Sequence, residues 1–339
     1  MRNARITVAI PTLAADSTLL GCLEALGRQT LQDWEAVVVD NSGKRLAREI
    51  LARVAEPRVR SIENETNAGF GRAVNQVYDA SQAPYLAALN DDAVPHPEWL
   101  QQLIRAMEER ADVGMGASQV RLAPDGALDS AGMLICADGS SKQRGHRAPP
   151  ARFSRLEEVL LPSGSAALYR RQMLDEIGGF DDRFFLYCED TDLGLRAQRA
   201  GWRCLYVPGA VVEHRYSHTA GRASPLKAYY VERNRLFVLF KNFPAREIAA
   251  SPFISAARYA WHLGFLLRGK GTAARYRDAG HSGLRLVWLV VAAHAALFRH
   301  AAGLIRDRRR IRRTARISDS AFRKLLRSHA ISAREVAEL

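Results

Sequence analysis

Two acidic groups are the parts of this sequence best suited to chemistry. The first is Asn90-Asp91-Asp92, which follows the apolar run at 85–89. Adjacent carboxylates repel each other, and hard divalent cations such as Mg²⁺ or Mn²⁺ favour oxygen ligands and bridge to phosphates. This group therefore predicts a metal site, although Asn-Asp-Asp is also a good sequence for a solvated turn.

The second group is Glu189-Asp190-Thr191-Asp192, which follows the aromatic segment at 184–187. Acidic residues at the start of a helix complement its dipole and accept hydrogen bonds from its free N–H groups, which favours a capping role. Capping does not account for three carboxylates in four positions behind aromatic side chains. We therefore assign capping to Asp192 or Thr191 and predict that Asp190 is a general base.

Two weaker signals are a histidine and a glycine-rich turn. His214 follows an expected strand at 204–207, and its neutral imidazole suits a Mn²⁺ site completed by Asp92 and diphosphate oxygens. A lone histidine is more often structural. In the segment 67–71 (NAGFG), the glycines would allow a ligand to approach the backbone, and the next helix would present N–H groups to phosphate. A plain loop explains the same glycines.

These residues need a framework that brings them together. Residues 1–120 alternate short apolar runs with helical patterns, which is typical of successive β–α–β units in a mostly parallel sheet. Ligands of such sheets bind beyond the carboxyl ends of the strands, and both Asp40 and the group at 90–92 follow expected strands. We expect strands at 6–10, 35–39, 58–62 and 85–89, and helices that begin at Ser17 or Thr18 and near Arg72.

Beyond this region the pattern is less regular. The segment 123–150 is rich in Gly, Pro, Ser and Arg, and we interpret it as a polar excursion or a mobile loop. We expect a strand at 160–169, helices at 171–177 and 193–200, and a last strand at 204–207 that ends before Pro208.

The charge is distributed unevenly along the 339 residues. The chain has 49 Lys and Arg against 36 Asp and Glu, a net charge of +13. Residues 225–339 hold 23 basic and 7 acidic residues, a net of +16, whereas residues 1–224 hold 26 against 29, a net of −3. We therefore divide the chain into a domain at 1–224 and a basic helical region at 225–339. Helices are expected at 226–240, 253–267, 286–305 and from Asp319.

The cysteines and the apolar runs of the sequence bear on the cellular compartment of the protein. The four cysteines are far apart and form no C-x-x-C pair, which favours reduced thiols in a cytoplasmic protein. The longest apolar run, 286–298, is shorter than the ~20 residues of a spanning helix, so we predict no transmembrane span and no signal peptide.

Together these segments resemble the family 2 glycosyltransferases, especially the bacterial rhamnosyltransferase-like branch. The resemblance runs from Ile6 to about Ser217, roughly two thirds of the chain, and its elements occur in the order of the family. Each piece is weak alone, but the ordered set is specific. The segments are VAIPT (8–12), CLEALGRQT (22–30), VVVDNSG (37–43), NAGFGRAVN (67–75), LNDDAVPHPEWL (89–100), GSAALYRR (164–171), IGGFDDRFFLYCEDTDLGLRAQRAGW (177–202) and VVEH (211–214).

The resemblance implies an α/β fold of the GT-A type, Rossmann-like and mostly parallel, with the helical basic region as a C-terminal appendage. It also implies an inverting, metal-dependent transfer of a sugar from a nucleoside diphosphate donor to a hydroxyl of a saccharide or lipid-linked saccharide, in bacterial cell-surface polysaccharide synthesis. The implied divalent metal is Mn²⁺ or Mg²⁺, bound by Asp92 and His214. Asp190 would be the catalytic base. The implied donor-binding residues are Pro11, Thr12 and Asp40 around the nucleoside, Asn67 and Gly69 in the glycine-rich turn, and Asn90 and Asp91 before the metal ligand.

One departure is that Asn90 stands where the family motif begins with Asp. An amide is common at this position in the branch, so the departure leaves the implied activity intact and concerns only the share of Asn90 in donor binding.

The resemblance also suggests partners. dTDP-rhamnose is the first donor to consider, followed by UDP-sugars, and the acceptor would be a saccharide or a polyprenyl-linked saccharide. Apolar helices flanked by arginines at 225–339 fit an anionic membrane surface, which would place a cytoplasmic protein at the inner face of the membrane. A solvated charged face on a helical subdomain explains the same residues. Two other functions stay open: a catalytically silent nucleotide-sugar-binding module, and a nucleic-acid-binding protein, for which we find no binding motif.

Overall fold

The computed structural model describes residues 4–14, 18–215 and 224–339 of the chain. Two compact units make it up: residues 1–133, 143–197 and 202–219 form the first, and residues 134–142, 198–201 and 220–339 form the second. Two short segments, 134–142 and 198–201, thus join the C-terminal helices. Ser17, where the first helix was expected to begin, and Ser217, where the resemblance ends, lie outside the described residues.

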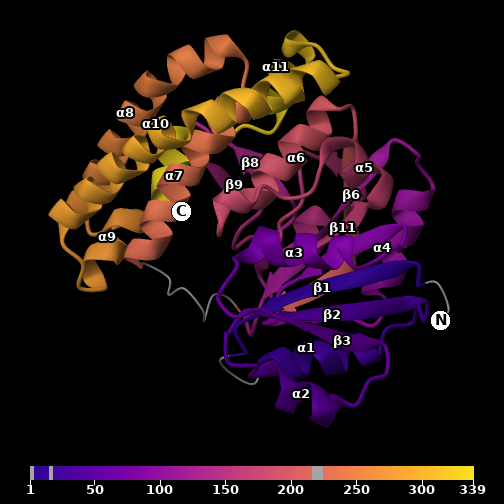
Figure 1. Ribbon diagram of the computed structural model, residues 1–339. Helices are drawn as coiled ribbons and strands as arrows, with labels where there is room; N and C mark the ends of the chain where they lie inside the picture. The colour runs from indigo at the N-terminus through magenta and orange to yellow at the C-terminus, as the bar shows by residue number, and fades with distance from the viewer. Residues whose placement is uncertain (1–3, 15–17, 216–223) are drawn as a thin grey trace. The chain divides into compact units, whose positions relative to one another are not determined.

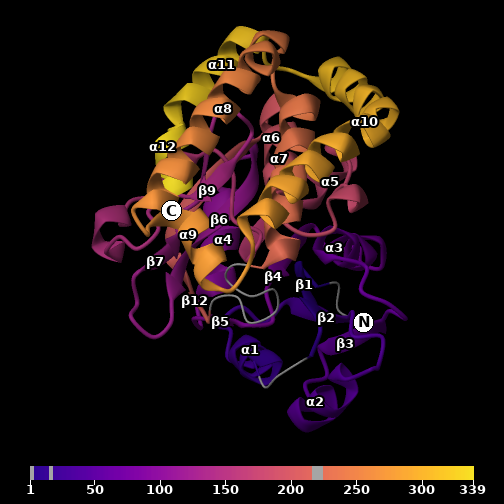
Figure 2. The ribbon, with the colours of Figure 1, turned by 90° about the vertical axis from the view of Figure 1, so that its left-hand side faces the viewer.

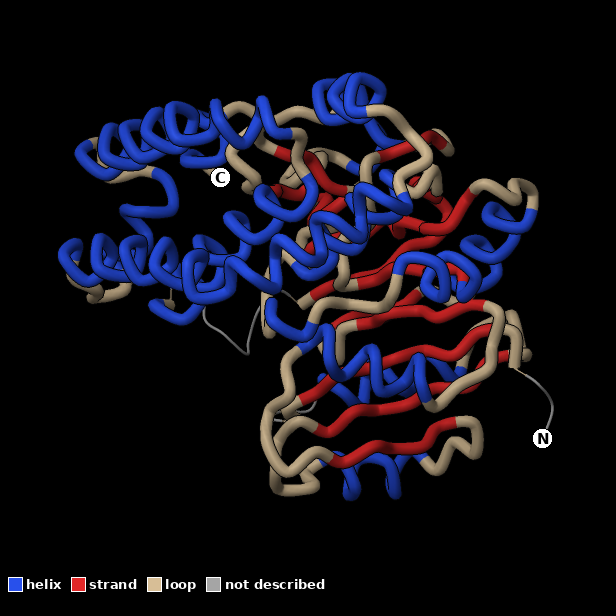
Figure 3. Tube along the Cα trace, turned by 45° about the horizontal axis from the view of Figure 1, so that its top comes forward, coloured by secondary structure: helices blue, strands red, loops and turns tan. Residues whose placement is uncertain are grey.

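The first unit is built on a mixed, mostly parallel sheet, whose strands lie side by side in Figure 3. The strand order along its main path is β10-β12-β6-β11-β4-β1-β2-β3, with β5 paired to β12 and β7 paired to β6. The strands are β1 (Ile6–Thr12), β2 (Trp34–Asp40), β3 (Val59–Glu63), β4 (Tyr85–Leu89), β5 (Ala93–Pro95), β6 (Val113–Leu122), β7 (Leu128–Ser130), β10 (Glu157–Val159), β11 (Ala166–Arg170) and β12 (Arg203–His214).

Strand direction gathers the loops of interest at one edge. The strands β1, β2, β3 and β4 run parallel to one another, and β12 runs parallel to β6. β11 is antiparallel to both β4 and β6, so β4, β6 and β12 share a direction and β11 begins where they end. The carboxyl ends of β1, β2, β4 and β12 and the amino end of β11 therefore lie along the same edge, as expected for a ligand site in such a sheet.

Helices cover both faces of this sheet because the inner strands are apolar on both sides. In Figure 1, α3 lies above β1 and β2, whereas α1 and α2 lie below them. The buried core includes Val8, Val38, Ala87 and Leu168 from neighbouring strands and Leu23 from α1. The helices of the unit are α1 (Thr18–Gly27), α2 (Ala47–Val54), α3 (Phe70–Asp79), α4 (Trp99–Glu108), α5 (Arg171–Ile177) and α6 (Glu189–Arg199), with short 3₁₀ turns at Pro150–Phe153 and Asp182–Phe184.

Three expectations about the strands need correction. Strand β12 does not end before Pro208 but continues to His214, because a break in its register with β6 between Val207 and Val211 absorbs the proline. The segment 123–150 is not irregular throughout: it forms β7, β8 (Met133–Ile135) and β9 (Ser141–Gln143). Of the strand expected at 160–169, only 166–169 is a strand, as part of β11; residues 160–165 form the loop between β10 and β11, which contains Gly164.

The second unit is helical, as its sequence pattern predicts. Its long helices α7, α8 and α10 are visible in Figure 2, and α10 packs against α7. The helix α10 is longer than expected, because it continues through most of the arginine-rich segment 306–316 that follows the expected helix at 286–305. The helices are α7 (Pro225–Asn242), α8 (Ala245–Leu267), α9 (Gly271–Asp278), α10 (Gly283–Thr314), α11 (Asp319–Ser328) and α12 (Ala333–Glu338).

A buried network of charges ties α7 and α8 to the segment 134–142. Arg235 of α7 is buried and donates to Glu232, to the main-chain oxygen of Asp138 at 3.0 Å and to Tyr259 of α8 at 2.8 Å. Arg258 of α8 lies 2.6 Å from Asp138 and 2.8 Å from Glu232. Each buried charge therefore has an opposite partner, which a buried charge requires.

Candidate active site

The residues predicted to bind metal meet at the carboxyl edge of the sheet. β5 is antiparallel to β12, and its register places Ala93 opposite His214. Asp92 directly precedes this pair, so its side chain lies beside the imidazole, with 3.0 Å between Asp92 Oδ1 and His214 Nε2. Asn90 also approaches this nitrogen, at 3.3 Å from its Nδ2. Residues 122 positions apart are thus brought together by the register of one short strand.

A residue that the sequence analysis missed completes this arrangement. Asp129 of β7 is buried, and its Oδ2 lies 3.0 Å from His214 Nδ1. Its other oxygen, Oδ1, lies 3.3 Å from Nδ1 of His146. The pairing of β7 with β6, the neighbour of β12, places Asp129 on the opposite side of the imidazole from Asp92.

The two carboxylates set the ionisation of His214. Burial alone lowers the pKa of His214, but the hydrogen bonds of its ring to Asp129 and Asp92 outweigh burial and raise the pKa to about 10. Burial alone raises the pKa of Asp129, whereas hydrogen bonds from His146 and His214 lower it to about 2. Without a metal, the site is therefore an imidazolium between two carboxylates.

The distance between Asp92 and His214 suits a divalent metal. Two ligands at ~2.1 Å from an ion and at right angles to each other are about 3 Å apart, which is the observed separation of Oδ1 and Nε2. A metal would replace the proton on Nε2, leaving Nδ1–H to Asp129. Within the described ranges no group of three or more His, Cys, Asp or Glu side chains is placed to hold a metal ion. Asp92 and His214 alone would leave coordination positions for a bound molecule or for water.

Asp190 lies in the first turn of α6 and is held by hydrogen bonds to its carboxylate. Its Oδ2 accepts from the N–H of Gly164 at 2.9 Å, and its Oδ1 accepts from the N–H of Thr191 at 2.6 Å. The next residue of the Gly164 loop, Ser165, accepts a hydrogen bond from the N–H of Asn90 at 2.9 Å. The loop before β11 thus touches both the Asp190 carboxylate and the loop that carries Asp92.

Burial changes the acidity of this second acidic group. Glu189 is buried, and burial together with the neighbouring charge of Asp190 raises its pKa to about 8. Burial also raises the pKa of Asp190, while hydrogen bonds from Gly164 and Thr191 limit the rise. A carboxylate with a raised pKa is a stronger base than a free one, which suits the role predicted for Asp190. Capping was expected of Asp192 or Thr191; Asp192 pairs at 2.9 Å with Arg196 of the same helix, and Thr191 Oγ1 donates to Asp190 Oδ1 at 3.2 Å.

The segment before Asp190 has a strained backbone. Phe185, Tyr187 and Cys188 have φ angles of 61°, 70° and 64°, in the left-handed region that residues other than glycine seldom adopt. Such strain persists only where the surroundings hold it, and it is concentrated at functional sites. One such contact is the hydrogen bond from the N–H of Phe70 to the carbonyl of Phe185, at 2.9 Å.

Gly69 explains how this contact is possible. Its φ is +83°, and a Cβ added there would lie 2.4 Å from the carbonyl oxygen of Phe185. Asn67 closes the same turn by accepting the N–H of Gly69 on its Oδ1 at 2.9 Å. The structure therefore gives the predicted donor residues Asn67 and Gly69 a second task, which is to seat the strained segment before Asp190.

The residues predicted around the nucleoside lie at the ends of β1 and β2. Pro11 and Thr12 are the last residues of β1, and Thr12 Oγ1 donates to Asp91 Oδ2 at 2.5 Å. Asp40 ends β2 and is buried, and its two oxygens accept the N–H groups of Ser42 and Ala47, each at 2.8 Å. Each oxygen keeps a second lone pair for a ligand.

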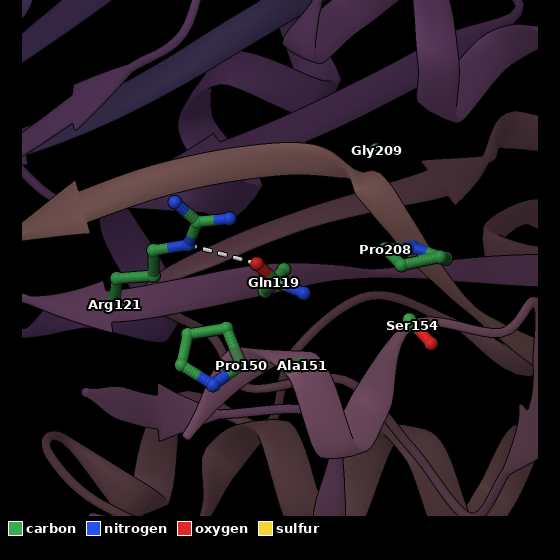
Figure 4. Close-up of a pocket in the computed structure, with 7 residues that line it drawn as sticks. All are labelled: Gln119, Arg121, Pro150, Ala151, Ser154, Pro208 and Gly209. Atoms are coloured by element: carbon green, nitrogen blue, oxygen red, sulfur yellow. Dashed lines mark hydrogen bonds between the residues drawn. The ribbon is translucent and has the colours of Figure 1, made fainter. Parts of the chain in front are cut away.

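A separate shallow pocket of about 370 Å³ lies elsewhere on the first unit, and Figure 4 shows its lining. Arg121 donates to Gln119 there at 2.8 Å. None of the predicted site residues lines this pocket, whose walls are formed by Gln119, Arg121, Pro150, Ala151, Ser154, Pro208 and Gly209.

Comparison with known proteins identifies relatives by sequence. Residues 7–178, about half of the chain, match the model of glycosyl transferase family 2. An N-acetylglucosaminyl-diphospho-decaprenol L-rhamnosyltransferase of Mycobacterium tuberculosis is 32% identical over 200 residues, which is 51% of this chain and 65% of that protein. The rhamnosyltransferase WbbL of Escherichia coli is 42% identical over 67 residues, 20% of this chain and 25% of its own. The chain thus matches less than two thirds of the length of either relative.

Solved structures give the fold. GalNAc-T7, crystallised with UDP, GalNAc and Mn²⁺, is 15% identical with a TM-score of 0.61, over 76% of this chain and 51% of its own. The mannosyltransferase PcManGT of Pyrobaculum calidifontis, crystallised with GDP-Man and Mn²⁺, is 19% identical with a TM-score of 0.52, over 92% of this chain and 86% of its own. At these identities the likeness establishes the fold alone, which is the predicted GT-A fold with a C-terminal helical region.

Proposed function

The chain belongs to glycosyl transferase family 2, and from this premise we propose that it transfers a sugar from a nucleoside diphosphate donor to a hydroxyl of a saccharide acceptor, with inversion at the anomeric carbon. We assign this chemistry to residues 1–224 and treat 225–339 as a separate helical region. The observation that supports the proposal best is that one loop joins the two halves of the site. Gly164 binds the Asp190 carboxylate, and the neighbouring Ser165 binds the loop of Asp92.

In this proposal Asp92 and His214 hold a divalent metal, Mn²⁺ or Mg²⁺, on the donor side. When bound, such an ion stabilises the negative charge that develops on the diphosphate leaving group, without proton transfer. Asp91 would meet the ribose or diphosphate of the donor, oriented by its 2.5 Å hydrogen bond from Thr12. Further residues would complete the donor site: Pro11, Asp40, Asn67, Gly69 and Asn90.

Asp129 is a positioning residue in this scheme. It holds His214 through Nδ1 and leaves Nε2 directed at Asp92. A carboxylate behind a ligating histidine fixes the tautomer and the orientation of the ring, and it makes the ring a better ligand. Asp129 would therefore act through His214 and not touch the substrates.

Asp190 would take the proton of the attacking acceptor hydroxyl. Its carboxylate is held at both oxygens, by Gly164 and Thr191, and does not need to reorganise during the reaction. Its raised pKa increases its affinity for the proton as the hydroxyl attacks. Attack on the face opposite to the leaving diphosphate forms the new glycosidic bond, breaks the bond to the donor phosphate and inverts the anomeric carbon.

The relatives suggest the substrates to try first. The mycobacterial relative is named for L-rhamnosyl transfer to N-acetylglucosaminyl-diphospho-decaprenol. We therefore propose a rhamnosyl donor such as dTDP-rhamnose as the first candidate, UDP-sugars as the second, and a polyprenyl-linked saccharide as the acceptor, in polysaccharide synthesis at the inner face of a bacterial membrane.

A product assay tests the proposal. Purified chain with Mn²⁺ is incubated with a panel of nucleoside diphosphate sugars and a short-chain polyprenyl diphosphate N-acetylglucosamine, and the products are followed by mass spectrometry and NMR. We expect acceptor-dependent release of nucleoside diphosphate and a glycoside of inverted configuration. Excess EDTA should abolish release, and added Mn²⁺ or Mg²⁺ should restore it. Donor binding without transfer to any acceptor would instead identify a silent nucleotide-sugar-binding module, and full activity in EDTA would remove the metal assignment.

A further inference from the structure

The outer face of α10 exposes a continuous apolar stripe. Leu284, Trp288 and Phe298 are 84%, 66% and 79% exposed, although side chains of this kind are usually buried in a soluble protein. With four further apolar residues they form a series with alternating steps of four and three residues, which keeps its members on one side of a helix. The exposed apolar positions on this side are Leu284, Trp288, Val291, Ala295, Phe298, Ala302 and Ile305. At 1.5 Å per residue this stripe is about 30 Å long.

The opposite face of the same helix is buried. Its buried residues are Leu289, Ala293, Ala296, Leu304 and Ile311, which also follow helical spacing. His300 lies against Phe237 of α7, with 5.3 Å between ring centres. Arg308 donates from Nη1 to the main-chain oxygens of Phe240 and Phe243, at 2.9 and 2.6 Å. The helix is therefore fixed along its inner side to other parts of the second unit.

This attachment favours a helix that lies on a membrane over a helix that spans it. By length and composition alone, α10 could cross a membrane, and only 22% of its most apolar stretch is buried. We predicted no spanning segment because the run at 286–298 is short, whereas the structure continues the helix in both directions. A helix that crossed the bilayer would have to give up its contacts with Phe237 and Phe240. A helix that lies in the interface plane keeps them and still buries its outer stripe.

The charges near the apolar stripe indicate which kind of membrane surface α10 would bind. Arg306, Arg309, Arg310 and Arg313 follow the apolar stripe on the same helix and are exposed. Asp307 is the only acidic residue in the sequence of α10. Arginines next to an exposed apolar stripe complement the negative potential of a leaflet that contains anionic lipids. The exposed outer face of α8 also carries apolar residues, Phe253 and Leu267, but only two exposed cations, Arg268 and Lys270, follow it closely, against four arginines on α10.

We propose that the outer face of α10 is a docking surface for an anionic bilayer, on which the helix lies in the plane of the membrane with Trp288 and Phe298 inserted and the arginines at the phosphate level. This inference does not depend on the transfer chemistry, since vesicle binding is measured without any substrate. It narrows the membrane attachment expected of residues 225–339 to one face of one helix.

Vesicle sedimentation of the full chain tests the docking surface. We expect binding to vesicles of phosphatidylglycerol and phosphatidylcholine in equal parts at low salt, and weak binding to phosphatidylcholine alone. The double variant Trp288→Asp with Phe298→Asp should bind at least about tenfold more weakly, because two inserted side chains are replaced by anions. The matched variant Phe253→Asp with Leu267→Asp changes two residues of 81% and 80% exposure on α8 and should bind like the unchanged chain.

Further measurements distinguish a bilayer surface from other partners that could cover this face of α10. Replacing Arg306, Arg309, Arg310 and Arg313 by Gln should remove the preference for anionic vesicles, and about 1 M salt, with a Debye length near 3 Å, should release the bound chain. Equal loss in the α8 variant would overturn the assignment to α10. Resistance to salt and alkaline extraction would indicate a spanning helix instead. If the α10 variant changed only the oligomeric state measured by ultracentrifugation, the face would be an interface with a second copy of the chain. Circular dichroism and thermal unfolding confirm that the variants fold.

Discussion

Asp129 Oδ2 lies 3.0 Å from Nδ1 of His214, on the opposite side of the imidazole from Asp92. The histidine is therefore held from behind by a carboxylate on β7 and directed at the carboxylate that follows β4. This geometry favours metal binding by His214, because a ring fixed in this way presents Nε2 to an ion with its orientation already set.

Asp129→Asn should weaken Mn²⁺ binding by about 10- to 100-fold, because the amide can donate as well as accept and no longer enforces one tautomer of His214. The affinity is measured by Mn²⁺ electron paramagnetic resonance or calorimetry in the presence of nucleoside diphosphate, with no turnover required. Asp125→Asn is the matched control, since Asp125 is exposed in the same region and lies 3.4 Å from Arg147. Unchanged Mn²⁺ affinity in Asp129→Asn would mean that Asp129 only packs the site.

Asp129 also shows where prediction from sequence reached its limit. The strands β1, β2 and β4 are apolar runs with clear ends, so local patterns predict them and place the group at 90–92 at the sheet edge. By contrast, β7 has three residues in a segment rich in turn formers, and it exists because β6 offers it a free edge. Local pattern has no information about such a pairing. The same holds for β12 beyond Pro208, where pairing with β6 and β5 outweighs the breaking effect of the proline.

Roles are harder to predict than positions. The motif order indicated Asp92, His214 and Asp190, and the structure brings Asp92 to His214 through the register of β5. The same order predicts Gly69 as a donor residue but cannot show that it contacts Phe185, because that contact joins segments more than a hundred residues apart. Tertiary contacts of this kind are absent from any local pattern.

Asp190→Asn should lower the turnover number by about 10²- to 10⁴-fold, the usual contribution of a general base, while donor affinity stays within about twofold. The amide cannot take the acceptor proton, yet it keeps the size of the carboxylate. Turnover is followed by acceptor glycosylation, and donor binding by calorimetry with Mn²⁺. Asp175→Asn offers a comparison at a carboxylate that accepts a hydrogen bond from Tyr78. Near-normal turnover of Asp190→Asn would show that another group takes the proton.

The neighbouring Glu189 should make stability depend on pH. Burial and the charge of Asp190 raise its pKa from 4.5 to about 8 in the folded chain. Between these values the folded chain keeps a proton that the unfolded chain has released, so the free energy of unfolding falls as pH rises from about 5 to 8. The contribution of Glu189 to the free energy of unfolding is fully present below pH 4.5 and is lost as pH rises through 8.

Glu189→Gln isolates this contribution, because glutamine resembles the protonated acid and does not titrate. The variant should gain stability relative to the unchanged chain by more than about 1 kcal/mol between pH 5 and pH 8, since one pKa unit corresponds to 1.36 kcal/mol. Urea unfolding of both chains at several pH values measures the difference, in which titrating groups that do not interact with Glu189 cancel. A difference that stayed constant with pH would contradict a proton on Glu189.

Gly69→Ala should damage both stability and turnover, and Gly126→Ala provides a closely matched control. Gly69 and Gly126 have φ angles of +83° and +70°, so alanine at either position should strain the backbone by a similar amount, about 1–2 kcal/mol. At Gly126 a Cβ would meet no atom within 4 Å, whereas at Gly69 it would lie 2.4 Å from the carbonyl oxygen of Phe185.

The clash in Gly69→Ala should lower the free energy of unfolding by at least about 2 kcal/mol more than Gly126→Ala does. It should also shift the strained segment before Asp190, lowering the turnover number by about tenfold or more. Thermal unfolding and acceptor glycosylation measure the two effects, and equal behaviour of the two variants would show that the contact of Gly69 with Phe185 does not position the base.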